Sequence, residues 1–346
     1  MPPKKDDGAA LKELKKALKE NSLGTLYLLH GEEAYLRDFY LGEIKKRILT
    51  PGLEEFNLHT IQGKDASPRV ISEAIDCLPM MSERTMVLVT DYDLFKAPAG
   101  ERDELAALFA DLPEYVCLVF VYDLIEYKPD ARTKLAQALK SCGSVVPFPH
   151  QDQGDLVDWI CRRFRALDHD IDSEQARYLI FLCGDLMNSL VGEISKIGAY
   201  AKQKRITRQD IDAVAVPRLD ARVFQMTDAV LNRNFDQAAR VLGDLLAQQE
   251  APIMILSVLG KQLRQLYTAR LGFEAHKSGR YLVDLWGMHP YPADKLMSAA
   301  ARFDLAWCRR AVVRAAETDL TMKSTGADAA ELLTGLLLEL AVGKAA

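Results

Sequence analysis

The sequence of 346 residues has no G-x-x-x-x-G-K-[ST] phosphate-binding loop, no C-x-x-C pair and no Cys/His cluster at metal-ligand spacing. It also has no apolar run that approaches the ~18 residues of a membrane-spanning helix. The first residues, MPPKKDDGAALKELKK, include lysines but lack the apolar segment of a secretory signal. We therefore expect a cytoplasmic protein that holds no metal and has no membrane partner.

Cysteine is sparse, and its six positions lie far apart in the sequence. This spacing is not typical of a disulfide framework or a zinc site. We expect free thiols that are buried as small apolar residues in a reducing compartment. The positions are Cys77, Cys117, Cys142, Cys161, Cys183 and Cys308.

An excess of positive charge is also absent, because 44 Lys and Arg stand against 49 Asp and Glu, for a net charge of −5. This balance argues against strong DNA binding through bulk electrostatics. A local basic face remains, since lysines near the N-terminus recur at helical spacing opposite Leu11, Leu14 and Leu18. Such a face is either solvated or DNA-facing. Its members are Lys12, Lys15, Lys16 and Lys19.

The sequence does contain a clear change of pattern along its length. Residues 1–150 alternate strand and helix signals, which predicts a parallel α/β domain. Residues 151–216 predict a small helical domain, and residues 217–346 predict an all-helical third domain. The expected strands are 25–30, 55–62, 85–90, 116–122 and 144–148, with helices at 34–49, 68–78, 101–110 and 129–141.

In the helical part, apolar residues recur at three- and four-residue spacing. Thr207 to Asp210 has the pattern of a capping box, whereas residues 279–292, with three aromatics and two prolines, suggest an irregular connection. The expected helices are 155–166, 173–183, 188–200, 207–216, 222–231, 235–248, 252–272, 293–302, 305–323 and 327–342.

The stretch TLYLLHGEEAYLRDFY begins like a nucleotide site, with an apolar strand, a glycine and an amphipathic helix. A phosphate at this helix would face Glu32 and Glu33 and would find neither further glycines nor a Lys-Ser or Lys-Thr pair. Two carboxylates suit the helix dipole but repel a triphosphate. We therefore expect a strand-loop-helix that does not bind ATP.

Other motifs give no catalytic constellation. There is no G-x-S-x-G nucleophile elbow. Asp91 and Asp93 follow an apolar strand, as Mg²⁺-holding carboxylates do in many ATPases, but they equally fit polar residues that end a strand. We expect no catalytic residue, no cofactor and no metal ligand.

The stretch ISEAIDCLPMMSERTMVLV places two methionines on a turn. Pro79 ends the preceding helix, and Met80 and Met81 fall before the strand that starts near residue 85. Two adjacent large side chains on a turn cannot both enter one core. They either fold back under neighbouring helices or form an exposed plug for a partner, a role that suits the adaptable thioether.

With this turn in place, the sequence resembles the delta subunit of the bacterial DNA polymerase III clamp loader over nearly its whole length. The matching segments occur in the family's order, although none is a catalytic motif. They are LYLLHGEEAYLRDFYLGEI, LPMMSERTMVLV, KPDARTKLAQALK, CGDLMNSLVGEISKIGAYA, ITRQDID, VFQMTDAVLNRNFDQA and ETDLTMKSTGADAAELL.

The resemblance implies an AAA+-like α/β domain with a degenerate phosphate loop, a helical lid domain and a C-terminal collar domain. It implies a subunit that hydrolyses no ATP, belongs to a DNA-directed DNA polymerase (nucleotidyltransferase) holoenzyme and opens the sliding clamp (beta subunit). Further implied partners are the gamma/tau and delta prime subunits of a five-subunit ring and primer-template DNA. By position, the clamp-binding residues are Met80 and Met81, with Leu78 and Pro79 beside them. The double Met departs from the Phe or Leu that is common in the family.

Two other functions remain open at this stage. An active AAA+ ATPase would bind nucleotide in spite of the degenerate loop. A DNA-binding scaffold unrelated to a clamp would depend on the N-terminal lysines and on Lys202, Lys204 and Arg205.

Overall fold

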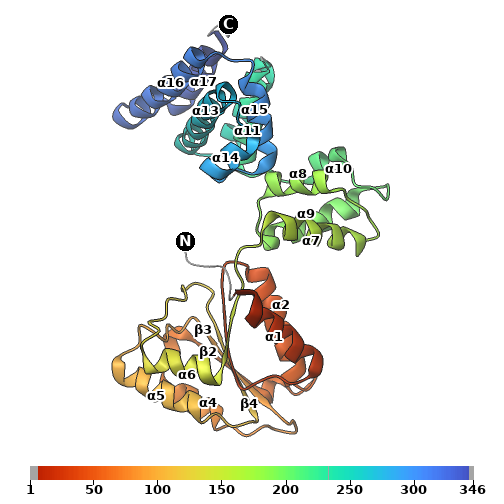
Figure 1. Cartoon of the computed structure of the whole chain (residues 1–346), viewed down its shortest axis with the longest axis vertical. Helices are drawn as coiled ribbons and strands as arrows, with labels where there is room; N and C mark the ends of the chain where they lie inside the picture. The colour runs from red at the N-terminus through yellow and green to blue at the C-terminus, as the bar shows by residue number, and fades with distance from the viewer. Residues whose placement is uncertain (1–6, 233, 343–346) are drawn as a thin grey trace. The chain divides into compact units, whose positions relative to one another are not determined.

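The chain folds into two compact units, one built on a sheet and one helical, in a computed structural model that describes residues 7–232 and 234–342 (Figure 1). The first unit comprises residues 1–152 and 186–188, and the second comprises residues 153–185 and 189–346. The three-domain division stays a prediction.

The first unit contains a five-stranded parallel sheet in the order β2-β3-β4-β1-β5. All five predicted strands are present, and the predicted parallel α/β fold is confirmed. The strands are β1 (Leu26–His30), β2 (Leu58–Gln62), β3 (Thr85–Thr90), β4 (Val116–Val121) and β5 (Ser144–Pro147).

Helices cover both faces of the sheet, which explains why the central strands are apolar on both sides (Figure 1). Leu28 and Phe120 face the core beneath α4, α5 and α6, whereas Leu29 and Val119 face the core beneath α1 and α2. The helices of this unit are α1 (Asp7–Glu20), α2 (Ala34–Ile48), α3 (Glu54–Asn57), α4 (Pro68–Ile75), α5 (Ala99–Ala110) and α6 (Lys134–Cys142), with a 3-10 turn at Gly63–Asp65.

Three predicted boundaries in this unit are wrong by three residues or more. The helix expected from residue 129 begins at Lys134, because the side chain of Thr133 caps the helix there. The strand expected from residue 55 begins at Leu58, because residues 54–57 form the short helix α3. The helix expected to reach residue 78 ends at Ile75, so that residues 76–84 form a longer connection to β3. A larger part of the chain than expected is therefore free of regular structure around the two methionines.

The second unit is helical, as predicted, and α11 to α17 share one apolar core. Thr207 and Asp210 form the predicted capping box. The helices are α7 (Gln153–Arg165), α8 (Ser173–Cys183), α9 (Met187–Tyr200), α10 (Arg208–Val214), α11 (Leu219–Leu231), α12 (Phe235–Ala247), α13 (Pro252–Glu274), α14 (Gly279–Trp286), α15 (Pro290–Ala300), α16 (Leu305–Ser324) and α17 (Ala329–Val342).

The irregular connection expected over residues 279–292 is wrong. Residues 279–286 form α14, which buries Gly279 and Leu282 against its neighbours and ends at Gly287 in the left-handed conformation (φ 61°). A close approach favours glycine at position 279, because a Cβ there would lie 2.1 Å from the Asp294 carboxylate. Tertiary packing thus stabilises a helix whose sequence is rich in turn signals.

The cysteines follow the prediction only in part. Cys117, Cys183 and Cys308 are buried free thiols, and burial raises the pKa of Cys117 to about 12. Cys77 and Cys142 are free but exposed, contrary to the prediction, because each lies near the end of a surface helix.

Candidate functional site

An exposed apolar cluster of the sheet unit is the segment of residues 78–81, hereafter the methionine turn. Leu78, Met80 and Met81 are 75%, 52% and 84% exposed, and Pro79 is half-buried. Their side chains therefore do not fold back under the helices, which removes the first of the two alternatives drawn from the sequence. An exposed apolar cluster of this kind is typical of a surface that binds another protein.

The backbone of the methionine turn is held by a buried amide. The side chain of Asn57 is 0% exposed; its Nδ2 donates to the carbonyl oxygen of Met80 at 3.0 Å, and its Oδ1 accepts the Met80 N–H at 2.8 Å. Met81 follows in the left-handed conformation with φ 52°. This conformation is costly for a side chain other than glycine, so the turn is a constrained structure.

The far end of the same connection is anchored by Arg84. Its guanidinium donates to three carbonyl oxygens, those of Leu23 at 2.8 Å, Gly24 at 2.8 Å and Val116 at 3.0 Å. Ser82 hydrogen-bonds the Thr50 hydroxyl at 3.1 Å. The exposed side chains of the methionine turn thus project from a backbone that is fixed on both sides.

The sequence does not reveal that Asn57 and Arg84 hold the methionine turn. Asn57 lies inside an expected strand, and its contact with Met80 joins residues that are 23 positions apart. The segment of residues 55–62, EFNLHTIQ, mixes polar and apolar residues, so no local signal distinguishes Asn57 or reveals its partner.

The methionine turn lies at the edge of the sheet where the parallel strands begin, because it precedes β3. Small ligands of open α/β sheets bind at the opposite edge, where the strands end. That edge carries the β1–α2 connection with Gly31. The exposed apolar cluster and the β1–α2 connection are therefore on different edges of the unit.

In the β1–α2 connection, the chain's own groups occupy the donors that a phosphate would need. The Glu33 N–H donates to the carbonyl oxygen of Phe148 at 3.0 Å, and the Ala34 N–H donates to that of Glu32 at 3.0 Å. Gly31 has φ 127°, and a Cβ there would lie 2.3 Å from the Phe148 oxygen. The side chain of Glu33 is 1% exposed, which places a carboxylate beside the helix N-terminus.

Of the two alternatives for Asp91 and Asp93, the hydrogen bonds support polar residues that end a strand. The Asp91 carboxylate accepts the N–H groups of Asp123 at 2.8 Å and Leu124 at 2.9 Å. Asp93 accepts the N–H groups of the two residues that follow Leu94 and pairs with Lys96 at 2.9 Å. Both carboxylates thus accept hydrogen bonds from other groups of the protein. Within residues 7–232 and 234–342, no group of three or more metal-ligating side chains occurs.

At the same edge, a buried arginine links α2 to β4. Arg37 is 3% exposed; its guanidinium donates to the carbonyl oxygen of Tyr122 at 3.1 Å and forms an ion pair with Asp123. Burial also raises the pKa of the Tyr122 hydroxyl. Internal hydrogen bonds thus connect α2, β4 and β5 at the edge where ligands of open α/β sheets bind.

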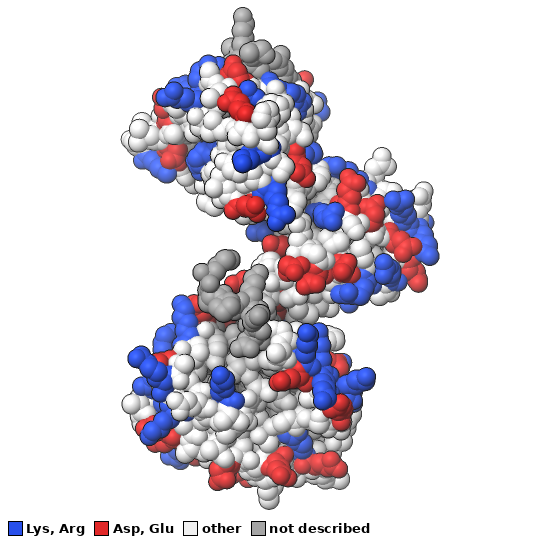
Figure 2. Space-filling view, viewed as in Figure 1, with Lys and Arg blue, Asp and Glu red and all other residues white. Residues whose placement is uncertain are grey.

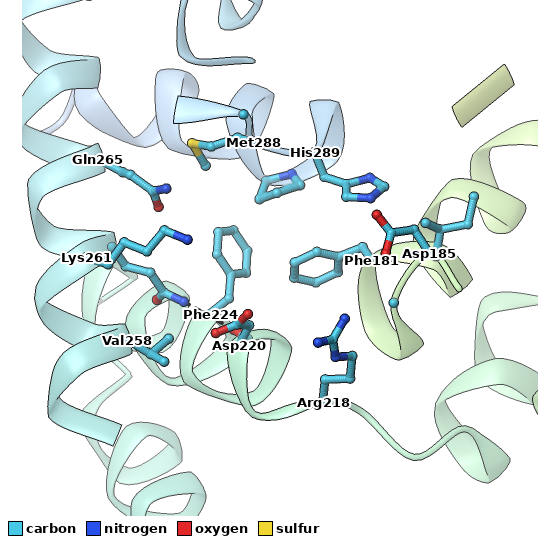
Figure 3. Close-up of a pocket in the computed structure, with 15 residues that line it drawn as sticks. Phe181, Asp185, Arg218, Asp220, Phe224, Val258, Lys261, Gln265, Met288 and His289 are labelled. Atoms are coloured by element: carbon cyan, nitrogen blue, oxygen red, sulfur yellow. Dashed lines mark hydrogen bonds between the residues drawn. The ribbon is translucent and has the colours of Figure 1, made fainter. Parts of the chain in front are cut away.

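The helical unit contains a pocket of 180 Å³ bordered by α8, α11 and α13 and by the turn before α15. Phe181, Phe224 and Lys261 converge on it from three different helices (Figure 3). Burial lowers the pKa of His289, whose ring nitrogen lies 3.0 Å from Gln153 Nε2. These side chains contain no nucleophile paired with a base, so the pocket does not suggest catalysis.

The predicted lysine face lies on α1. Leu14 and Leu18 are buried beneath it, and the lysines are exposed, with Lys15 Nζ 5.8 Å from the ring centre of Tyr40. On the face drawn in Figure 2, Lys and Arg are interspersed with Asp and Glu. Whether Lys12, Lys15, Lys16 and Lys19 meet DNA stays a prediction.

No helix in the described part of the chain is both long enough and apolar enough to cross a bilayer.

Comparison with known proteins gives consistent matches along the chain. Residues 27–148 match the profile of the family "DNA polymerase III, delta subunit", and residues 220–340 match its C-terminal domain. DNA polymerase III subunit delta of Bacillus subtilis is 24% identical over 332 residues, which cover 94% of this chain and 95% of that protein. A probable delta subunit from Aquifex aeolicus is 23% identical and covers 71% of this chain and 70% of its own length.

Among solved structures, the Bacillus subtilis DNA clamp loader delta protein superposes with a TM-score of 0.57 and 23% identity, covering 96% of this chain and 99% of that one. The predicted combination of a parallel α/β sheet with further helices is confirmed by this similarity and by the parallel five-stranded sheet. Since the two family profiles together span more than half of the chain, the protein belongs to the delta-subunit family of bacterial DNA polymerase III.

Proposed function

We propose that this protein binds and opens the sliding clamp during bacterial DNA replication, and that the methionine turn is the contact. The observation that carries the proposal is the exposure of Leu78, Met80 and Met81 on a turn whose backbone is hydrogen-bonded to the buried Asn57. A rigid, exposed apolar projection fits an apolar pocket on a partner better than it fits a solvated surface.

The size of this contact suits a binding hot spot. Burial of two Met side chains contributes roughly 1.5–3 kcal/mol each before the costs of association. Binding alone opens nothing, because a ligand shifts an equilibrium only by its differential affinity for the two states. The turn must therefore bind the clamp edge in its open geometry more tightly than in its closed geometry.

In this proposal the sheet unit contributes its shape to the assembly and hydrolyses no ATP. The Glu33 N–H is already bonded to Phe148, and the Glu33 carboxylate is buried nearby. ATP bound by neighbouring gamma/tau subunits would control access to the methionine turn. Residues 217–346 would join the collar of a five-subunit ring with delta prime, around primer-template DNA, in the cytoplasm.

The test is the affinity of the full chain for the sliding clamp of the same organism. We expect the double variant Met80→Ala, Met81→Ala to weaken binding at least about 100-fold, since two anchors of the contact are lost. The matched control is Leu124→Ala, which removes an 87% exposed leucine from the loop after β4 at the opposite edge of the sheet. We expect this control to bind like the wild type.

A second control addresses the scaffold alternative. Charge reversal of Lys12, Lys15, Lys16 and Lys19 should leave clamp affinity unchanged and should reduce only the salt-dependent affinity for primed DNA. If the double methionine variant instead kept full clamp affinity while the lysine variant lost the protein's activity, a DNA-binding scaffold would be the better description.

A further inference from the structure

We propose that Asn57 is a positioning residue of the clamp-binding site: its carboxamide fixes the backbone of the methionine turn so that the apolar side chains are presented in the geometry they need when bound. This inference rests on the proposed function. It assigns a role to a side chain that itself has no exposed surface.

Asn57 joins three parts of the unit, two through its carboxamide and one through its backbone oxygen. Nδ2 donates to the carbonyl oxygens of Leu53 at 3.1 Å and Met80 at 3.0 Å, and Oδ1 accepts the Met80 N–H at 2.8 Å. The backbone oxygen of Asn57 accepts the hydroxyl of Thr85 at 2.9 Å, at the start of β3. The side chain therefore pairs with both backbone groups of Met80, as a neighbouring strand would do in a sheet.

The hydrogen bonds also fix which atom of the amide is oxygen. With nitrogen and oxygen exchanged, Oδ1 would face two carbonyl oxygens and the NH₂ group would face the Met80 N–H. Asp has the same shape but lacks the NH₂ donor when ionised, and Leu lacks every polar atom. Asn is thus the residue whose donors and acceptor match this position.

The position of the bonds connects Asn57 with binding. Met80 lies in the connection between α4 and β3, outside any helix or strand. Without the amide, the backbone of the methionine turn could sample other conformations, and the clamp would have to select the competent one. Loss of the amide should therefore reduce clamp affinity without removing any contacting side chain.

The experiment measures clamp affinity of the full chain for Asn57→Ala alone and combined with the double methionine variant. We expect Asn57→Ala to weaken binding about tenfold, which corresponds to about 1.4 kcal/mol, and to add nothing once both methionines are alanine. The matched control is Thr85→Val, a buried substitution that removes a hydrogen bond to Asn57 but leaves both bonds to Met80. It should lower stability and keep the affinity.

Amide hydrogen exchange of the wild-type protein tests the inference directly, so its result does not depend on whether Asn57→Ala folds. In the wild type, the Met80 N–H should exchange much more slowly than an unprotected peptide amide, because it donates to a buried oxygen. In Asn57→Ala, protection should be lost at Met80 and kept in β3. Exchange of the wild-type Met80 amide at the unprotected rate would overturn the inference.

The outcomes separate this inference from the proposed function. If the double methionine variant loses clamp affinity but Asn57→Ala does not, the role of Asn57 is wrong and the site stands. The role of Asn57 is also wrong, and the site stands, if Thr85→Val weakens clamp binding as much as Asn57→Ala does. The same conclusion follows if Asn57→Ala weakens clamp binding further in the double methionine variant. If the double methionine variant binds like the wild type, the proposed site fails and the inference fails with it.

Discussion

At the scale of single residues, Met81 is a position where folding stability and the proposed clamp binding favour different residues. Its backbone has φ 52°, a conformation that costs a non-glycine residue roughly 1–2 kcal/mol, while its side chain is 84% exposed. An exposed side chain adds little to the core, so folding alone does not favour methionine here. Strain that is retained on an exposed apolar residue is a feature of functional sites.

This strain leads to a prediction for Met81→Gly. Glycine relieves the backbone strain but adds entropy to the unfolded chain, so the free energy of unfolding should stay unchanged or rise by up to about 1 kcal/mol. Clamp affinity should nevertheless fall, because one anchor of the contact is gone. Urea denaturation and a clamp titration measure the two quantities.

The matched control is Met80→Gly, because Met80 has no positive φ. Here glycine should destabilise the protein by roughly 0.5–1 kcal/mol, as it does at ordinary positions. Equal losses of stability in the two variants would contradict the assigned strain at Met81.

The residue-level prediction from sequence succeeded where the signal was local. Pro79 and the following apolar strand place Met80 and Met81 on a turn, and the structure confirms this position; their exposure was one of the two alternatives that the sequence left open. The role of Asn57 was not predicted because the residue that it contacts, Met80, is 23 positions away in the sequence. A sequence pattern does not show which distant backbone groups a polar side chain satisfies.

At the scale of elements, β1 and α2 have the strand-loop-helix order of a nucleotide site, and internal hydrogen bonds hold the loop between them. The Glu33 N–H donates to Phe148, which follows β5, and so ties the loop to the neighbouring strand. Arg37 of α2 reaches the end of β4. These bonds make the element a support for the sheet.

This element leads to a prediction about nucleotide binding. In isothermal calorimetry, the isolated full chain should show no binding of ATP with Mg²⁺ at micromolar to hundreds of micromolar concentration, because backbone donors and charge are both unsuitable. An intact AAA+ ATPase subunit serves as the positive control. Binding with a micromolar Kd would favour the alternative of an active ATPase.

Element prediction from sequence was accurate where burial on both faces left long apolar runs, as in β3 and β4. It failed at α3 and α14, two short helices whose formation depends on tertiary contacts more than on local propensity. The capping box at Thr207 was found correctly because its two partners are three residues apart.

At the scale of the whole molecule, the proposed division of labour places binding on the sheet unit and assembly on the helical unit. The methionine turn and the β1–α2 connection lie on different edges of one sheet. In the proposed function, a rigid-body movement that neighbouring subunits impose would reach the methionine turn without a change within the core of the sheet unit.

The location of the clamp contact can be tested directly through Cys77, which is exposed and precedes Leu78. Cys142, at the end of α6, is a second exposed thiol in the same chain and serves as an internal control. The measurement is the rate of maleimide modification of both thiols, followed by peptide mass spectrometry, with and without saturating sliding clamp. The account predicts that the clamp slows modification of Cys77 at least about tenfold and leaves Cys142 unchanged. Equal rates at Cys77 with and without bound clamp would contradict it.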